Sequence, residues 1–206
     1  MSFELSQEEG KVLVHLARCT VKRYIEEGKW PSPPKQVSPK LLEKCGVFVT
    51  ISTLQGGEKN LRGCIGYPYP TNSLIEAVID SAINAATEDP RFEPMTLHEL
   101  NCVVFEVSVL TPPQQVKTDN PKEYVQKIKV GEDGLIIEQG HQRGLLLPQV
   151  PIEWGWGAEE FLCQCCIKAG LPPDSWLTKD TKIYRFHAII FEEEIPNGNI
   201  KRLQLK

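Results

Sequence analysis

The sequence contains no apolar run of the roughly 18–20 residues that a helix needs to cross a bilayer. Its first ten residues, M-S-F-E-L-S-Q-E-E-G, lack the basic region and following apolar region of a secretory signal. No cluster of Lys and Arg resembles a nucleic-acid footprint, and the formal net charge of −4 disfavours binding to a polyanion. We therefore expect a cytoplasmic protein that binds neither a membrane nor nucleic acid.

Several chemical motifs are also missing. The chain has no G-x-S-x-G motif, no Walker motif and no dinucleotide-binding fingerprint. C-Q-C-C at 163–166 has no second Cys or His group at the spacing of a zinc site, so packing in a core explains these cysteines better than a metal does. The sequence thus predicts neither a metal nor another cofactor.

The composition is that of an ordinary globular protein. Hydrophobic residues make up 41% and charged residues 24% of the chain. Its length of 206 residues is enough for one substantial domain or two small ones. The seven cysteines lack the regular spacing of a disulfide framework. We expect most of them to be reduced thiols, and five or six to be buried as small hydrophobic residues.

Apolar periodicity and end signals predict helices and strands in mixed order. Ser6 with Glu9, and Ser73 with Glu76, have the spacing of a capping box at a helix start. We expect helices at 7–27, 73–87, 121–128 and 158–169, and strands at 46–54, 61–65, 102–110, 135–138, 144–147 and 183–191. Because helices and strands do not alternate strictly, the pattern favours an α+β fold over a doubly wound sheet.

The segment N-L-R-G-C-I-G-Y at 60–67 is the first candidate site. Gly63 and Gly66 permit positive φ and allow another group to approach the backbone closely. If the segment is extended, Arg62 and Cys64 leave the same face, and a guanidinium near a thiol favours the reactive thiolate. The alternative is a tight strand end with a buried cysteine and an exposed arginine.

Two further groups of polar residues could join this site. Asp89 and Arg91 lie in E-D-P-R-F-E-P at 88–94, where they could bind a polar ligand or simply pair with each other in a rigid turn. Glu106 and Ser108 share one face of a predicted strand, and that face is either solvated or covered. A covered Glu106 would need a cationic partner, for which Arg62 or Arg91 is a candidate.

Several sequence blocks in a fixed order resemble the AMMECR family, known in prokaryotes as AmmeMemoRadiSam system protein A. The blocks are L-R-G-C-I-G (61–66), D-P-R-F-E-P (89–94), V-S-V-L (107–110), G-L-L-L-P-Q-V (144–150), E-W-G-W (153–156) and K-A-G-L-P-P-D-S-W (168–176). The resemblance runs from about residue 5 to residue 194. It implies a single AMMECR-type domain over residues 1–206, with mixed or antiparallel sheets flanked by helices.

The resemblance also implies two interleaved lobes, one larger and one smaller, with L-R-G-C-I-G near a cleft between them. It implies partners similar to Memo and to radical S-adenosylmethionine proteins, but no established reaction. Cys163 and Cys165 depart from the family pattern, which further weakens a metal site at C-Q-C-C.

Two functions therefore stay open. In the first, the protein is an enzyme acting on a small or anionic substrate, with Cys64 as nucleophile, Glu106 in proton transfer and Arg62 lowering the pKa of the thiol. In the second, it is a non-catalytic module that binds a protein or a small ligand. Both place the same residues at the site: Arg62, Gly63, Cys64, Gly66, Asp89, Arg91 and Glu106.

Overall fold

A computed structural model describes residues 3–34, 36–69 and 71–203 of the chain. The chain forms two compact units, and it leaves the first unit after Leu110 and returns to it at Ile189. Residues 111–188 make up the second unit. No helix in the described part of the chain is long and apolar enough to span a membrane.

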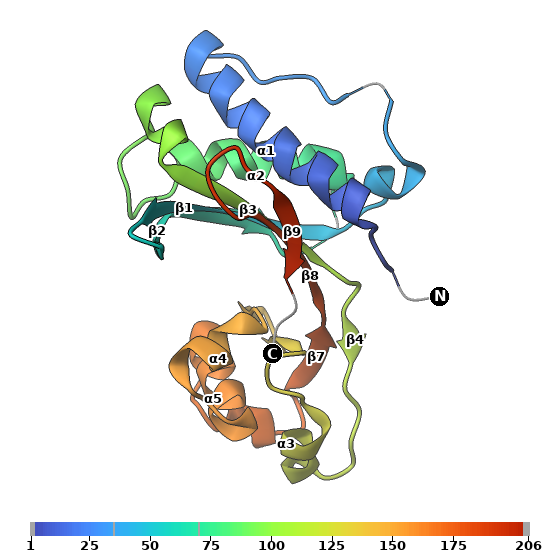
Figure 1. The fold of residues 1–206 in the computed structure, drawn as a ribbon. Coiled ribbons are helices and arrows are strands. Elements are labelled where there is room, and N and C mark those ends of the chain that lie inside the picture. The colour runs from blue at the N-terminus through green and yellow to red at the C-terminus, as the bar shows by residue number, and fades with distance from the viewer. Residues whose placement is uncertain (1–2, 35, 70, 204–206) are drawn as a thin grey trace. The chain divides into compact units, whose positions relative to one another are not determined.

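The first unit contains a five-stranded sheet of order β2-β1-β3-β8-β9. Its strands are β1 (Gly46–Gln55), β2 (Glu58–Tyr67), β3 (Val103–Leu110), β8 (Ala188–Glu193) and β9 (Ile200–Leu203). Helices α1 (Gln7–Glu27) and α2 (Leu74–Thr87) pack side by side over β1, β2 and β3 (Figure 1). The β1–β2, β1–β3 and β8–β9 pairings are antiparallel. The 3₁₀ helices of this unit are η1 (Pro39–Leu42) and η2 (Leu97–Asn101).

Both long helices begin at the expected capping boxes. The Ser6 side chain accepts from the Glu9 backbone, and the Glu9 side chain accepts from the Ser6 backbone. Ser73 and Glu76 repeat this arrangement at the start of α2. Each box satisfies backbone N–H groups that have no partner inside the helix.

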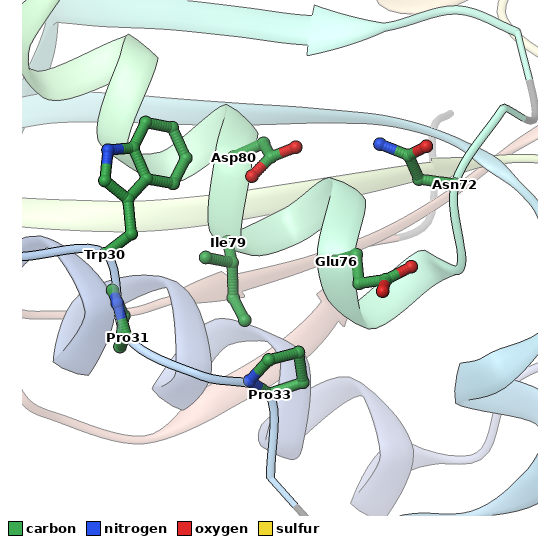
Figure 2. Close-up of a pocket in the computed structure, with 7 residues that line it drawn as sticks. All are labelled: Trp30, Pro31, Pro33, Asn72, Glu76, Ile79 and Asp80. Carbon is green, nitrogen blue, oxygen red and sulfur yellow. The ribbon is translucent and has the colours of Figure 1, made fainter.

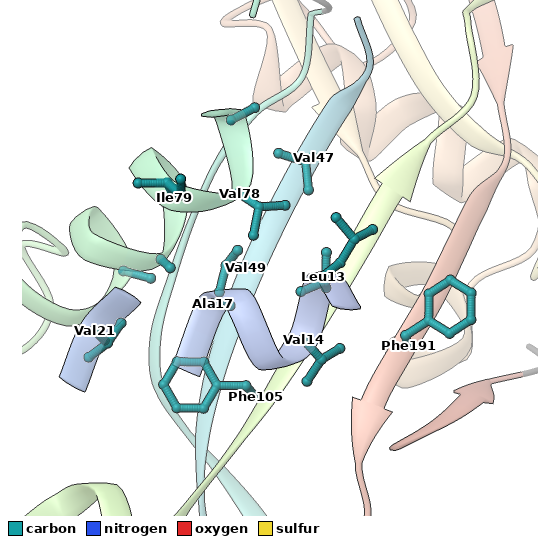
Figure 3. Packing of buried hydrophobic residues seen from close by; sticks show 14 of the residues in the cluster. Leu13, Val14, Ala17, Val21, Val47, Val49, Val78, Ile79, Phe105 and Phe191 are labelled. Atoms are coloured by element: carbon teal, nitrogen blue, oxygen red, sulfur yellow. The ribbon is translucent and has the colours of Figure 1, made fainter. Parts of the chain in front are cut away.

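The core of the first unit lies between the two helices and the sheet (Figure 3). Alternate residues of β1 and β3 point into it, as the period of two in a strand requires. The labelled side chains in Figure 3 come from α1, α2, β1, β3 and β8: Leu13, Val14, Ala17, Val21, Val47, Val49, Val78, Ile79, Phe105 and Phe191.

A buried ion pair joins α1 to β8. Arg18, 6% exposed, donates through Nε to Glu193 at 2.6 Å, and its Nη2 also contacts that carboxylate. Nη1 and Nη2 donate to the backbone oxygens of Leu100 and Val103 at 2.8 and 2.6 Å. Glu193 additionally accepts from the Phe105 N–H at 3.0 Å. These bonds compensate the desolvation of two charges in the core.

The second unit contains a four-stranded antiparallel sheet of order β4-β7-β5-β6. The strands are β4 (Gln114–Gln115), β5 (Gly134–Gln139), β6 (Gln142–Leu146) and β7 (Lys182–Phe186). Its helices are η3 (Pro121–Glu123), α3 (Tyr124–Lys127), α4 (Gln149–Trp154), α5 (Ala158–Lys168) and η4 (Ser175–Leu177). The three cysteines of C-Q-C-C lie on α5 in or against the core of this unit.

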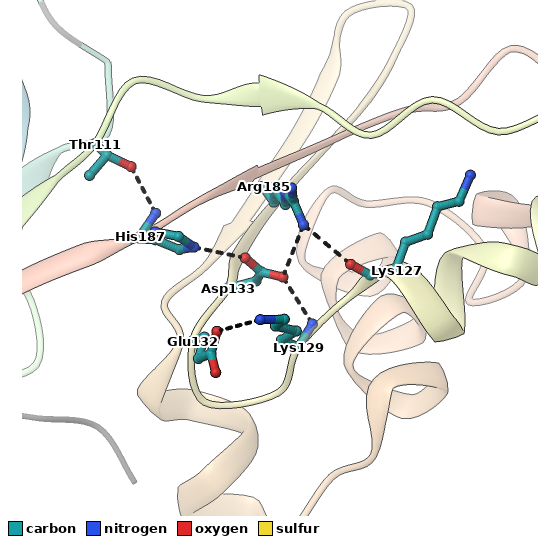
Figure 4. Close-up of polar contacts among 7 residues, drawn as sticks. All are labelled: Thr111, Lys127, Lys129, Glu132, Asp133, Arg185 and His187. Carbon is teal, nitrogen blue, oxygen red and sulfur yellow. Dashed lines mark hydrogen bonds and ion pairs between the residues drawn. The ribbon is translucent and has the colours of Figure 1, made fainter. Parts of the chain in front are cut away.

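The expected single strand at 183–191 is wrong. This segment forms two strands separated by His187. The first, β7, belongs to the four-stranded sheet, and the second, β8, belongs to the five-stranded sheet. The His187 N–H donates to the Thr111 side chain at 2.9 Å, a contact outside the regular ladder (Figure 4). The sequence also failed to predict β4, β9 and α4.

A fully buried carboxylate lies beside this interruption (Figure 4). Asp133 accepts from the Lys129 N–H at 2.9 Å and lies 3.2 Å from His187 Nε2. Arg185 Nη1 is 3.9 Å from the same carboxylate. This cluster joins β7 to the loop before β5 inside the second unit.

The expected α+β class is confirmed, since helices cover sheets whose strands pair in antiparallel fashion. All seven cysteines are unpaired. The expectation that five or six are buried is wrong, because Cys45, Cys165 and Cys166 are buried, whereas Cys19 and Cys102 are exposed.

Candidate functional site

Three polar side chains from neighbouring strands form a row on the five-stranded sheet. Cys64 of β2 and Glu106 of β3 both lie opposite Thr50 of β1 in the strand register. The flanking β1 residues Val49 and Ile51 belong to the helix-covered core, so strand alternation places the row on the opposite face. Each of the three side chains is half-buried, and the Thr50 hydroxyl donates to the Cys64 sulfur at 3.3 Å.

Glu106 ends this row on the side of β3. The Ser108 hydroxyl, two residues further on the same face, donates to Glu106 Oε1 at 3.1 Å. Ser108 and Val104 are 1% and 3% exposed, so this face of β3 is covered and the solvated alternative is wrong here. The hydrogen bond from Ser108 holds the Glu106 carboxylate in a defined position.

The segment D-P-R-F-E-P at 89–94 covers the backbone of Cys64 at the outer edge of the sheet. β2 is an edge strand, so one side of its backbone faces no other strand. Asp89, 4% exposed, accepts the Cys64 N–H at 2.8 Å. Arg91 donates to Asp89 at 2.9 and 2.7 Å and to the Cys64 carbonyl oxygen at 3.4 Å. The expected ion pair between Asp89 and Arg91 is thus present. The two side chains bind the backbone N–H and carbonyl oxygen of Cys64, the groups that a neighbouring strand would otherwise bind.

The environment of Cys64 disfavours the thiolate. Burial raises the pKa of the Cys64 thiol, and the carboxylates of Glu106 and Asp89 contribute to the increase. The hydrogen bond from Thr50 and the charge of Arg91 act in the opposite direction without outweighing burial. These effects together favour the protonated thiol over the thiolate. Hydrogen bonds from Arg91 and from the Cys64 N–H hold the pKa of Asp89 well below its ordinary value.

The expectation that Arg62 lowers the pKa of Cys64 is wrong. A β-bulge between β1 and β2 pairs Ser52 with Leu61 and Ile51 with Gly63, so Arg62 is the extra residue. Its Nε donates to Glu99 at 2.6 Å, and its Nη2 donates to the Glu93 carbonyl oxygen at 2.9 Å. The bulge breaks the alternation on which the sequence argument depended.

The two glycines serve close packing. A Cβ at Gly63 would lie 2.0 Å from the carbonyl oxygen of Ala85 on α2. One at Gly66 would lie 2.3 Å from the Val47 carbonyl oxygen and 2.5 Å from the Phe48 ring. Neither glycine has positive φ, so the close approach expected at these positions is present and the unusual conformation is not.

Comparison with known proteins assigns the chain to a family. A family model described as AMMECR1 matches residues 14–191. The chain belongs to the AMMECR1 family. The match spans residues of both compact units, and it confirms the resemblance carried by the sequence blocks.

Archaeal AMMECR1 relatives align along nearly the whole chain. Protein PH0010 of Pyrococcus horikoshii is 54% identical over 206 residues, which is 100% of both chains. Protein MJ0810 of Methanocaldococcus jannaschii is 52% identical over 198 residues, covering 95% of this chain and 96% of that protein. The crystal structure of PH0010, titled as an uncharacterized protein, matches with a TM-score of 0.91, covering 98% of this chain and 99% of that one.

Within this AMMECR1 fold, the expected residues separate into two groups. Asp89 and Arg91 bind the backbone of Cys64, and the charge of Glu106 acts on its thiol. Arg62 instead contacts Glu99 and Phe92. Sequence reasoning missed Thr50, which links Cys64 to Glu106. Pairing the predicted strands 46–54 and 61–65 across a turn at Gly56 and Gly57 would have suggested a polar partner for Cys64 in β1, although the bulge obscures the register.

The site offers hydrogen-bonding side chains. In the described residues, no group of three or more His, Cys, Asp or Glu side chains is arranged to hold a metal ion. The row instead presents a thiol, a hydroxyl and a carboxylate, with the Arg91 guanidinium near its edge. These groups can hydrogen-bond a small polar molecule.

Proposed function

We propose that the row of Cys64, Thr50 and Glu106 is a binding site for a small polar ligand, and that Cys64 acts there as a neutral thiol. The observation that carries this proposal is the placement of the three half-buried side chains side by side on one sheet face. The increase in the pKa of Cys64 supports a contact role over a nucleophilic one.

The chemistry of the row selects the kind of ligand. The Glu106 carboxylate accepts hydrogen bonds, so a ligand bearing ammonium or amide N–H groups fits beside it. The thiol and the hydroxyl supply a soft contact and an adaptable donor or acceptor. We also propose that both units act as one AMMECR-type domain over residues 1–206, since the family model runs across both.

An enzyme with Cys64 as nucleophile is the second candidate. It is supported by the Thr50 hydrogen bond and the charge of Arg91, both of which favour the thiolate. Substrate binding that neutralised Glu106 would remove one opposing charge and move the thiol toward reactivity. The cleft between lobes and the Memo-like and radical S-adenosylmethionine partners implied by the resemblance stay predictions under both candidates.

A ligand screen with three variants tests the proposal. Wild type is heated with a panel of amino acids, amines and amides, and a compound that binds the folded state raises the melting temperature. We expect Glu106→Gln to lose most of this shift, and Cys64→Ser to keep most of it. Ser52→Ala, on the same face of β1 one position beyond the bulge, is the matched control and should keep all of it.

The contrary outcome is equally specific. If no compound stabilises wild type, while iodoacetamide labels Cys64 faster than free cysteine at about pH 7, the binding proposal is wrong and the enzyme candidate replaces it. A Cys64→Ser variant that loses all of the shift would also count against a neutral contact role.

A further inference from the structure

A pocket of about 290 Å³ lies in the first unit, and it shares no lining residue with the row of Cys64, Thr50 and Glu106. One wall is the proline-rich segment after α1 and the other is the first half of α2 (Figure 2). We call it the strap pocket. The strap pocket is not part of the proposed ligand site, and the family match assigns no role to it.

The wall from the proline-rich segment is rigid and aromatic. Trp30, Pro31 and Pro33 form it, and the proline rings restrict the backbone. The Trp30 side chain packs edge-to-face on Tyr24 at 6.0 Å between ring centroids, yet Trp30 stays 53% exposed. An indole fixed on one side and open on the other is suited to contact a ligand.

The wall from α2 is acidic over an apolar base. Glu76 and Asp80 are four residues apart and so lie on one face of the helix, with the buried Ile79 between them (Figure 2). Asn72, before the helix, points across the pocket toward Asp80 (Figure 2). One oxygen of Glu76 is taken by the capping box with Ser73, at 2.6 Å.

Asp80 is half-buried in this wall. It makes no hydrogen bond or ion pair with any other described residue. Burial and the charge of Glu76 raise the pKa of Asp80. Lys44, which lies outside the described lining, contributes to lowering the pKa of Glu76. The described lining itself contains no Lys, Arg or His, so a cation from outside would compensate the burial of Asp80 and its repulsion by Glu76.

We propose that the strap pocket binds a small organic cation, an ammonium group on a short aliphatic chain. Asp80 and Glu76 are its counter-ions, Asn72 accepts a further hydrogen bond, and the Trp30 indole contacts the ammonium group through its ring face. The volume is just below the usual range for drug-sized ligands, which suits a molecule the size of a diamine.

Calorimetric titration of the full chain with 1,4-diaminobutane tests this inference, with 1,4-butanediol as the uncharged probe of the same length. We expect the diamine alone to bind. Asp80→Asn should weaken its affinity about fivefold, as loss of one partly exposed ion pair does. Trp30→Ala should weaken it about threefold through the lost cation–π contact.

Asp119→Asn is the matched control, because it removes one exposed carboxylate from the second unit and should leave the affinity unchanged. Equal binding of the diol, or equal affinity in wild type, Asp80→Asn and Trp30→Ala, would overturn the proposal. So would binding of a lysine-containing peptide with no binding of the free diamine. Should Asp80→Asn fold poorly, the exposed Trp30 gives an independent variant.

Discussion

Asp89 binds the backbone of Cys64 across the outer edge of β2, with its Oδ2 atom 2.8 Å from the Cys64 nitrogen. This contact joins two residues that are 25 positions apart and belong to different sequence blocks. Because Asp89 also binds Arg91, which approaches the Cys64 carbonyl oxygen, the edge of the strand is closed at this residue. The D-P-R-F block therefore has a structural role whether or not it contacts a ligand.

The first prediction concerns this contact and its dependence on pH. Asp89→Asn should lower the free energy of unfolding by about 1–3 kcal/mol at neutral pH, because the charge-assisted bonds to Arg91 are lost. The folded-state pKa of Asp89 lies below its unfolded value, so its contribution is present above the unfolded pKa and is lost as pH falls through the folded one. Urea unfolding of wild type and Asp89→Asn between about pH 7 and 2 measures this contribution to the free energy of unfolding.

The difference between wild type and Asp89→Asn should therefore shrink in acid. The exposed Asp119→Asn serves as control and should stay within about 0.5 kcal/mol of wild type at each pH. A constant difference from neutral pH to about pH 2 would contradict the electrostatic explanation.

The second prediction concerns the reactivity of Cys64. Since burial raises the pKa of the thiol, iodoacetamide should label Cys64 in the folded protein at least about tenfold more slowly than in the urea-unfolded chain at about pH 7.5. The folded rate should rise with pH above the ordinary thiol pKa. Peptide mass spectrometry separates Cys64 from the other six cysteines.

Glu106→Gln provides the matched variant for this measurement. Removing the Glu106 charge removes one cause of the raised pKa, so Cys64 should react faster in Glu106→Gln than in wild type at the same pH. Identical rates would show that the carboxylate does not influence the sulfur.

Local sequence signals predicted the two long helices and the strand at 102–110 well. The capping boxes at Ser6 and Ser73 act within four residues, so the sequence contains everything needed to recognise them. The apolar alternation of 102–110 likewise identified the face of β3 that packs under the helices.

The site could be predicted only in part, because its geometry depends on contacts distant in sequence. The register that sets Cys64 and Glu106 on either side of Thr50 involves three separate strands. The bulge at Arg62 overturns the conclusion, drawn from simple alternation, that Arg62 and Cys64 lie on the same face of the strand. The break at His187 falls inside an uninterrupted strand-like pattern, since the residues on both sides favour extended structure and only the sheet to which each half belongs distinguishes them.

The third prediction tests the close contact between β2 and α2. Gly63→Ala places a methyl group 2.0 Å from the Ala85 carbonyl oxygen, so backbone must move. We expect the free energy of unfolding to fall by about 2–3 kcal/mol or more, measured by urea denaturation. Gly157→Ala is the control, because nothing lies within 4 Å of the added carbon and φ is not positive there, and it should change stability by less than about 1 kcal/mol.

The last prediction concerns the buried pair of Arg18 and Glu193. Arg18→Leu leaves Glu193, which is fully buried, without its cation and should lower the free energy of unfolding by about 3–5 kcal/mol. Adding Glu193→Gln removes the uncompensated charge but keeps an acceptor for the Phe105 N–H. The double variant should therefore be more stable than Arg18→Leu alone in urea denaturation. If the two substitutions are simply additive, the cost lies in lost packing of the Arg18 side chain and not in an isolated buried charge.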